Sequence, residues 1–334
     1  MSADAGSGPP VVDVDGLAKQ FVVYERRGRV RRARTTRDAV AGVSFAVGAG
    51  EMVGYVGPNG AGKSTTVKML TGILVPTSGR ATVAGRIPWK ERIDLARRIG
   101  VVFGQRSNLW WDLPLADSFD LLRHLYRVPA SRHAERLAEC TERLELGAFL
   151  ATPVRQLSLG QRMRGELTAA LLHDPEVLFL DEPTIGLDIV SKAKVREFLV
   201  DRNREYGTTV MLTTHDLDDI ERLCSRLLII DHGRAIYDGN LATLRERFGE
   251  HRTLVVDLAA PAPPLEIDHA EVVKVDGPRQ WLRFHRRTMT AAELIAAVAA
   301  HTDLVDLTIE EPEIEDIVAT IYARGDASGT EPSR

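Results

Sequence analysis

The residues with the clearest chemistry form a glycine-rich run that reads G-P-N-G-A-G-K-S and extends from Gly57 to Ser64. It follows the apolar stretch 52–56 and precedes a helical pattern over 65–74, which is the strand–loop–helix context of a phosphate-binding loop. Glycines let successive backbone N–H groups turn toward an anion, and the positive end of the next helix faces the same anion. Lys63 is then expected to reach the β- and γ-phosphates, and the Ser64 hydroxyl to bind Mg²⁺. A chance glycine-rich turn would lack the flanking strand and helix, so the run predicts a nucleoside triphosphate site.

A pair of carboxylates ends a second apolar run. Residues 177–180 read V-L-F-L, and Asp181 and Glu182 follow; a continuous apolar run of this length is typical of a strand buried on both faces. At the strand tip, Asp181 would bind Mg²⁺, directly or through water, beside the phosphate loop. Because successive side chains along a strand point in opposite directions, Glu182 would face the attacking water as general base. Acidic residues merely exposed at a strand end are the alternative, but together with a phosphate loop the pair predicts hydrolysis.

Composition limits the class of protein and the number of domains. Of the 334 residues, 44% are hydrophobic and 27% charged, which fits a globular chain with one large and one smaller domain. The net charge of −4 argues against a protein that binds nucleic acid with its whole surface, although a local basic patch is compatible with it. No apolar run approaches the roughly 18 residues that span a bilayer, and the N-terminus has no signal-peptide pattern, so we expect a cytosolic chain unless a partner holds it at a membrane. Cys140 and Cys224 are too few for a disulfide framework or a metal site and are expected to be buried thiols.

Apolar strands alternate with helical patterns, which predicts a parallel sheet covered by helices on both faces. Residues 106–157 instead show helical periodicity without a strand, which indicates a helical insert. A proline-rich break at 261–264 precedes strand and helix patterns that predict a small α/β accessory domain. The expected organisation is a disordered N-terminus at 1–10, a nucleotide-hydrolysing domain at 11–240, the accessory domain at 241–324 and a disordered tail at 325–334.

Arginine dominates a short polar segment between two predicted strands, from about residue 26 to residue 37. Contact with anionic lipid headgroups would be worth about 1 kcal/mol for each basic residue near the surface. The segment has no apolar face that could enter a membrane. We therefore favour a solvated loop inserted between two strands, with lipid contact as the alternative.

Residues 157–161 read L-S-L-G-Q, and here the chain resembles the ATP-binding cassette family, the nucleotide-hydrolysing subunits of ABC transporters. That family carries an L-S-G-G-Q signature at a helix start upstream of the acidic strand. Leu159 stands where the usual pattern has glycine, but the Ser158 hydroxyl and the Gly160 backbone remain, so phosphate contact should survive. By itself the stretch would be interpreted as a helix N-cap by Ser158.

Other positions match the family in order and spacing. Gln105 matches the Q-loop glutamine that senses Mg²⁺ and the attacking water, and residues 186–188 match the D-loop that crosses the dimer interface. His215 matches the switch histidine that contacts the γ-phosphate. Phe21 fits the aromatic residue that stacks on adenine, with Tyr24 as the competing candidate.

The resemblance covers residues 11–240 and implies an α/β P-loop ATPase. Its parts would be a RecA-like parallel sheet core, an antiparallel β subdomain, a helical subdomain at about 106–157 and the small C-terminal α/β accessory domain. ATP and Mg²⁺ are the implied cofactors. The implied ATP contacts are Phe21, Gly57, Pro58, Asn59, Gly60, Ala61, Gly62, Lys63, Ser64, Thr65, Ser158, Gly160, Gln161 and Asp188; the implied Mg²⁺ residues are Ser64, Gln105 and Asp181; and the implied catalytic residues are Glu182, His215 and Gln105.

In this family two like ATPase subunits pair head to tail, and a separate membrane permease forms the transport pathway. We therefore expect a homodimer, or a pair of like subunits, held at the cytoplasmic face of the membrane through permease subunits, without a nucleic-acid partner. Trp110 and Trp111 follow the Q-loop, in the region where the family receives a coupling helix of the permease. Two adjacent tryptophans cannot both face one helix interior, so we expect at least one to face a partner, with simple core packing as the alternative.

The C-terminal unit is similar to accessory domains of drug and polysaccharide exporters, and the run from 104 to 112 is similar to that of viologen-type exporters. Both features favour export of a substrate that the sequence does not identify. The alternatives are an importer ATPase and a non-transport cassette that acts on ribosomes or DNA. The single cassette and the lack of sustained heptads disfavour the second alternative.

Overall fold

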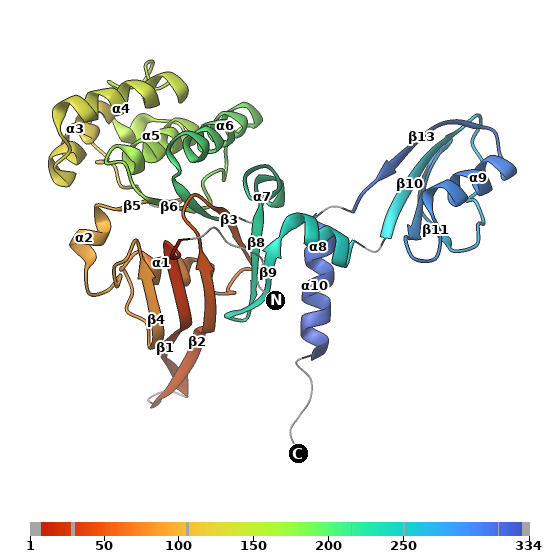
Figure 1. Ribbon diagram of the computed structural model, residues 1–334, viewed down its shortest axis with the longest axis horizontal. Helices are drawn as coiled ribbons and strands as arrows, with labels where there is room; N and C mark the ends of the chain where they lie inside the picture. Colours follow the sequence, from red (N-terminus) through yellow and green to blue (C-terminus); the bar gives the residue numbers. More distant parts are fainter. Residues whose placement is uncertain are drawn as a thin grey trace. The chain divides into compact units, whose positions relative to one another are not determined.

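The structure is a computed structural model that describes residues 8–27, 31–104, 107–214, 216–249, 251–312 and 314–328. Contacts divide the chain into two units, Met1–Asp238 and Gly239–Arg334, which are described separately (Figure 1). The sequence places the boundary at residue 240, close to this division. In the part of the chain that is described, no helix combines the length and the apolar character needed to cross a bilayer.

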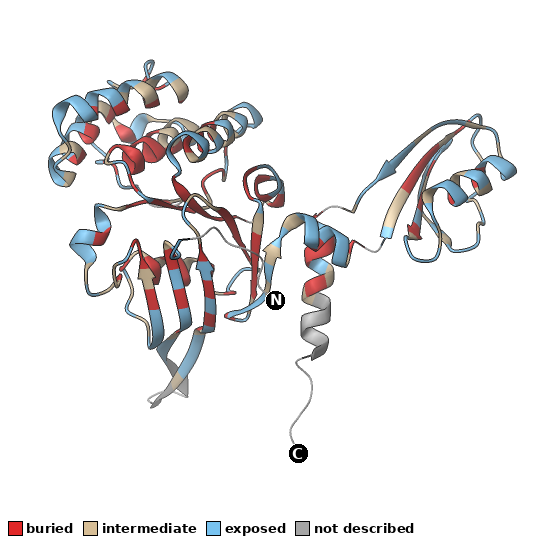
Figure 2. Cartoon of the chain, viewed as in Figure 1, coloured by how far each residue is buried: buried red, intermediate tan, exposed pale blue. Residues whose placement is uncertain are grey.

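A six-stranded sheet forms the centre of the first unit, in the order β5-β6-β7-β3-β8-β9. Its strands are β3 (Met52–Val56), β5 (Ile99–Phe103), β6 (Val177–Asp181), β7 (Thr209–Thr213), β8 (Arg226–Asp231) and β9 (Arg234–Asn240). The pairs from β5 through β8 are parallel, and the central strands are buried along their length (Figure 2). The prediction of a helix-covered parallel sheet is therefore confirmed. Since parallel strands end at one edge, the loops after β3, β6 and β7 meet there.

An antiparallel sheet, β2-β1-β4, stands beside this core (Figure 1). Its strands are β1 (Val12–Arg27), β2 (Arg31–Val47) and β4 (Ser78–Val83). The first two pair from Val12↔Val47 out to Arg27↔Arg31, so the interpretation of the arginine-rich segment as a loop is wrong. The run Val22–Tyr24 is rich in residues that favour strands, and continuous backbone pairing carries the arginines into a hairpin.

Helices cover the sheet and form the insert. They are α1 (Lys63–Leu70), α2 (Arg92–Ala96), α3 (Leu115–Tyr126), α4 (Ala130–Arg143), α5 (Leu159–Leu171), α6 (Ile189–Tyr206) and α7 (Leu217–Leu223), with a 3₁₀ turn at Val154–Gln156. The segment predicted as a helical insert contains α3 and α4. Fully buried Leu115 and Phe119 anchor α3, and both helices pack on α5.

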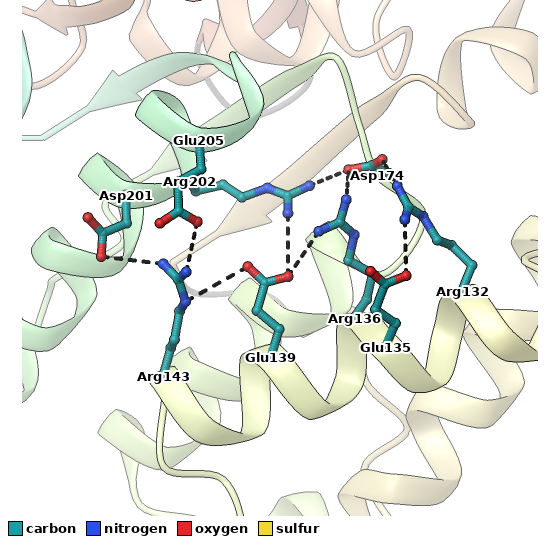
Figure 3. A network of polar contacts seen from close by, with 9 residues as sticks. All are labelled: Arg132, Glu135, Arg136, Glu139, Arg143, Asp174, Asp201, Arg202 and Glu205. Carbon is teal, nitrogen blue, oxygen red and sulfur yellow. Dashed lines mark hydrogen bonds and ion pairs between the residues drawn. The ribbon is translucent and has the colours of Figure 1, made fainter.

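A network of charged side chains joins α4 to α6 and to the turn after α5 (Figure 3). Its members are Arg132, Glu135, Arg136, Glu139, Arg143, Asp174, Asp201, Arg202 and Glu205. The buried guanidinium groups of Arg136 and Arg202 both donate to Oδ1 of Asp174, and both stack on the ring of Tyr206, with guanidinium carbons 4.3 and 4.0 Å from its centroid. The charges of Arg136 and Arg202 outweigh the effect of burial and hold the pKa of the Asp174 carboxyl below its ordinary value.

The second unit contains a four-stranded antiparallel sheet in the order β11-β12-β10-β13. Its elements are β10 (His251–Leu258), β11 (Ala270–Asp276), β12 (Arg279–His285), α9 (Ala291–His301) and β13 (Leu304–Glu310). One face packs on α9 through a core that includes Leu254, Phe284 and Val298. The sequence interpretation missed β10. It also treated the prolines at 261–264 as a break, whereas they lie inside this unit and their backbone is held by the buried Gln280.

Two helices, α8 (Leu241–Phe248) and α10 (Ile314–Ser328), flank this sheet in sequence and pack on each other. The chain leaves α8 and returns to α10 at one place, because a Cβ on Gly249 would lie 3.1 Å from Cγ of Pro312. Helix α10 continues to Ser328, past residue 325, where the tail is predicted to begin.

Candidate nucleotide-binding site

The glycine-rich run forms a loop between β3 and α1 in which glycine is needed at particular positions. Gly62 caps α1 at φ 104°, and a side chain there would collide with the carbonyl oxygen of Ala39. A Cβ on Gly57 would lie 2.5 Å from the carbonyl oxygen of Ile230. The loop is therefore held close to neighbouring backbone, and its concave side leads into the N-terminus of α1, which suits an anion.

Lys63 folds over this loop. Its ammonium donates to the carbonyl oxygens of Gly57 and, at 3.1 Å, of Pro58. Burial lowers the pKa of Lys63, while the negative charges of Glu182 and Asp181 oppose that shift. A buried ammonium between two carboxylates and an anion-binding loop is placed to neutralise phosphate charge.

Asp181 ends β6 at the same edge of the sheet. Its Oδ1 accepts hydrogen bonds from the hydroxyls of Thr213, at the end of β7, and of Ser64 at 3.3 Å. The described residues contain no group of three or more His, Cys, Asp or Glu side chains that could hold a metal. One carboxylate and one hydroxyl fit Mg²⁺, because that ion keeps several waters and is completed by phosphate oxygens.

Glu182 follows Asp181 but leaves the strand conformation. Its φ is +59°, a left-handed value that costs energy for any residue other than glycine, and its N–H donates to the carbonyl oxygen of Thr213 at 2.9 Å. The prediction relied on strand alternation to separate the two carboxylates. The structure instead turns the backbone at Glu182, and both residues line one cleft.

The cleft has a volume of about 470 Å³. Its lining includes most of the predicted phosphate and metal residues, namely Asn59, Gly60, Gly62, Lys63, Ser64, Thr65, Asp181 and Glu182. It also includes residues that the sequence did not suggest, namely Ala39, Lys68, Phe103, Gly104 and Ile185. Phe21 on β1 does not line it; the residue is 40% exposed, and the ammonium of Lys19 lies 5.4 Å from the centroid of its ring. The side chain of the competing Tyr24 lies outside the described residues.

The signature residues and Asp188 belong to two helix starts rather than to this cleft. Ser158 forms a capping box with Gln161 at the start of α5, in which each side chain bonds the backbone of the other. Asp188 caps α6 by accepting from the hydroxyl of Ser191 at 2.7 Å and from its N–H at 2.9 Å, and these hydrogen bonds lower the pKa of its carboxyl. The family resemblance implies that Ser158, Gly160 and Gln161 contact ATP, but none of these three described residues lines the cleft of their own chain. Gln105 and His215 lie outside the described residues.

Two buried carboxylates near the site escaped the sequence analysis. Glu166 on α5 accepts from the hydroxyl of Ser107 and from the N–H of Asn108 at 3.0 Å, and burial raises its pKa. Asp219 on α7 accepts from Thr184 and Arg196. Both tie loops beside the cleft to helices, and their partners lie far away in the sequence, so no local pattern marks these two acids.

Comparison with known proteins agrees with this geometry. Residues 40–185 match the family model described as ABC transporter. The linearmycin resistance ATP-binding protein LnrL of Bacillus subtilis (strain 168) is 30% identical over 303 residues, which cover 88% of this chain and 97% of that protein. The daunorubicin/doxorubicin resistance ATP-binding protein DrrA of Streptomyces peucetius is 34% identical over 275 residues, covering 78% and 82%.

Among solved structures, a dimeric ATP-binding cassette in a post-hydrolysis state bound to ADP and Pi is 26% identical, with a TM-score of 0.60 over 69% of this chain and 98% of that one. A structure described as the ATP-binding subunit of an ABC transporter has a TM-score of 0.62 at 25% identity, over 72% and 93%. With the phosphate loop, the acidic strand and the signature helix in place, the chain belongs to the ABC transporter family as an ATP-binding subunit with ATPase activity.

Proposed function

We propose that this chain powers export through a separate membrane permease, to which it binds from the cytoplasmic side. The observation that carries the ATP-driven step of the proposal is the division of the site. The cleft contains Lys63, Asp181 and Glu182, while Ser158 and Asp188 start helices elsewhere on the same unit. A second copy, arranged head to tail, would bring its own Ser158 and Gly160 to the open side of the cleft.

In the closed pair, each residue has a definite task. The loop N–H groups and Lys63 hold the phosphates of ATP, and Ser64 and Asp181 hold Mg²⁺, which neutralises phosphate charge when bound. Glu182 accepts a proton from the attacking water. Hydrolysis then depends on positioning and charge stabilisation, so it waits for closure of the pair. Gln105 and His215 are proposed to contact Mg²⁺ and the γ-phosphate, and Phe21 the adenine.

The permease would contact the start of the helical insert. Trp110 and Trp111 are 41% and 51% exposed, and Leu125 on α3 is 63% exposed. The guanidinium of Arg162 on α5 lies 5.8 Å from the Trp111 ring centroid. An exposed set of large apolar side chains next to the signature helix suits a partner segment, and contact there would reach α5 directly.

Export is proposed over import because several relatives are named for resistance to antibiotics or for export. An antibiotic or another apolar small molecule is the proposed class of substrate. Purified wild-type chain and the Glu182→Gln variant test the hydrolytic part. The variant should bind ATP with wild-type affinity, form an ATP-dependent dimer, and turn over at least about a hundredfold more slowly.

Glu176→Gln is the matched control, since Glu176 precedes the same strand and pairs with Arg98 at the surface. It should hydrolyse ATP at the wild-type rate. Capture of Glu182→Gln from native membranes with Mg-ATP should bring down a polytopic membrane protein. Ribosomal proteins or nucleic acid in its place would favour a non-transport cassette and remove the transport proposal.

A further inference from the structure

The departure from the family signature has a structural counterpart in the same chain. Leu159 is the first residue of α5 and is 37% exposed. Its Cδ2 occupies the space that a Cβ on Gly186 would fill. Gly186 lies in the loop before α6 at φ +68°, a conformation that favours glycine. The side chain of Leu159 therefore packs directly against the backbone of Gly186.

The same two segments are also close to each other at the next position. A Cβ on Gly160 would lie 3.6 Å from Cδ2 of Leu187 and 3.5 Å from Oγ of Ser191, which is ordinary van der Waals distance. Leu187 is 8% exposed, and Ser191 holds the cap of α6. The start of the signature helix and the loop before α6 are therefore neighbours, and the contact across them is made by the side chain of Leu159.

We propose that Leu159 is a positioning residue that makes these two loops move as one body. The inference rests on the proposed function, in which both loops meet the nucleotide bound by a second copy. With glycine at 159, Gly186 would face no side chain from the signature loop, and the two loops could adjust independently. With leucine, placement of Ser158 fixes the placement of Asp188.

The contact is tested by a double-mutant cycle on unfolding. Gly186→Ala places a methyl group against Leu159 in the wild-type background, but meets open space in the Leu159→Ala background. We expect Gly186→Ala to lower the melting temperature by more in the first background than in the second, because residues in contact are not additive. Equal shifts in the two backgrounds would overturn the contact.

The positioning role is tested by steady-state hydrolysis with the full chain. Leu159→Ala should lower kcat by about tenfold, because small misplacements of loops that complete a site are costly, with KM for ATP within about twofold of wild type and little change in melting temperature. Leu159→Met should restore kcat. Ile93→Ala, which truncates an aliphatic side chain that is 75% exposed on α2, should behave as wild type.

Wild-type kcat in Leu159→Ala, or parallel losses of kcat and melting temperature there, would overturn the role. These outcomes differ from failure of the proposed function. If the proposed function fails, the wild-type chain will show no ATP hydrolysis that depends on Glu182, and the positioning role fails with it. The double-mutant cycle on unfolding would still test the contact between Leu159 and Gly186.

Discussion

Asp174 offers a direct test of what holds the helical insert to the core. Its carboxylate accepts from Arg202, from Arg136 at 3.1 Å and from Arg132 at 3.4 Å. The side chains of Arg136 and Arg202 are each 3% exposed, whereas that of Asp174 is 39% exposed. Asp174→Asn removes the negative charge with little change in shape, and leaves Glu139 as the remaining carboxylate near the two buried guanidinium groups.

The expected loss of stability depends on the burial of the two arginines and on the partial exposure of Asp174. Removing one partner of a buried ion pair costs about 3–5 kcal/mol, and partial exposure of Asp174 screens part of this. We therefore expect a loss of about 2–4 kcal/mol, which for a unit of this size lowers the melting temperature by roughly 5–15 °C. Glu135→Gln is the control, because among the described residues Glu135 pairs only with the half-exposed Arg132 and is itself 63% exposed; its loss should stay below about 0.5 kcal/mol.

The pH dependence gives a second check. The pKa of Asp174 is lower in the folded chain than in the unfolded chain, so its stabilisation is complete above the unfolded value, about 3.9, and is lost as pH falls through the folded value. Urea unfolding should show a constant difference between wild type and Asp174→Asn from pH 6 to 8, and a shrinking one below about pH 4. A difference under about 0.5 kcal/mol at pH 7 would refute the view that this cluster holds the insert.

Three further changes probe the site. Gly62→Ala should weaken ATP binding by at least about tenfold in titration calorimetry, because its methyl group meets the Ala39 carbonyl in a left-handed backbone; unchanged affinity would remove the loop geometry as the cause. Thr213→Val removes a hydrogen bond worth about 1 kcal/mol from Asp181, so half-maximal hydrolysis should need roughly fivefold more Mg²⁺, and an unaltered Mg²⁺ requirement would contradict this. For Glu166, burial raises the folded pKa, so stability falls as pH rises from the unfolded value of about 4.3 through the folded value. Glu166→Gln should lack this decline in urea unfolding, and an identical pH profile would exclude the assignment.

The features that the sequence predicts well are those with a local pattern. The phosphate loop is recognisable because Gly62, Lys63 and Ser64 stand between an apolar strand and a helix. The acidic strand is recognisable because it is buried on both faces and therefore apolar along its length. In both places neighbours in sequence suffice to define the structure, and Lys63, Ser64 and Asp181 meet as expected.

Other features depend on contacts far apart in sequence. The hairpin formed by β1 and β2 is stabilised by backbone pairing between the two strands. The run of arginines has no alternation of apolar and polar residues, so periodicity does not predict a strand there. The left-handed turn at Glu182 arises where the chain bonds to Thr213 on the next strand, and nothing in residues 177–182 signals it. Glu166 likewise has its partners in a loop about 60 residues earlier in the chain, and such long-range pairs leave no local trace.

The chain between α8 and α10 builds the small sheet of the second unit, and this segment can be regarded as an insertion between two packed helices. Gly249 and Pro312 adjoin, so the chain that builds β10 to β13 starts and finishes at one point on a pair of packed helices. Domains joined in this way tolerate exchange, because the ends that must be reconnected already lie together. A short linker from Gly249 to Pro312 would close the gap and keep the helix pair covalently continuous. The segment that forms the sheet could then be exchanged between related chains without any change in the sequence of the ATP-hydrolysing unit.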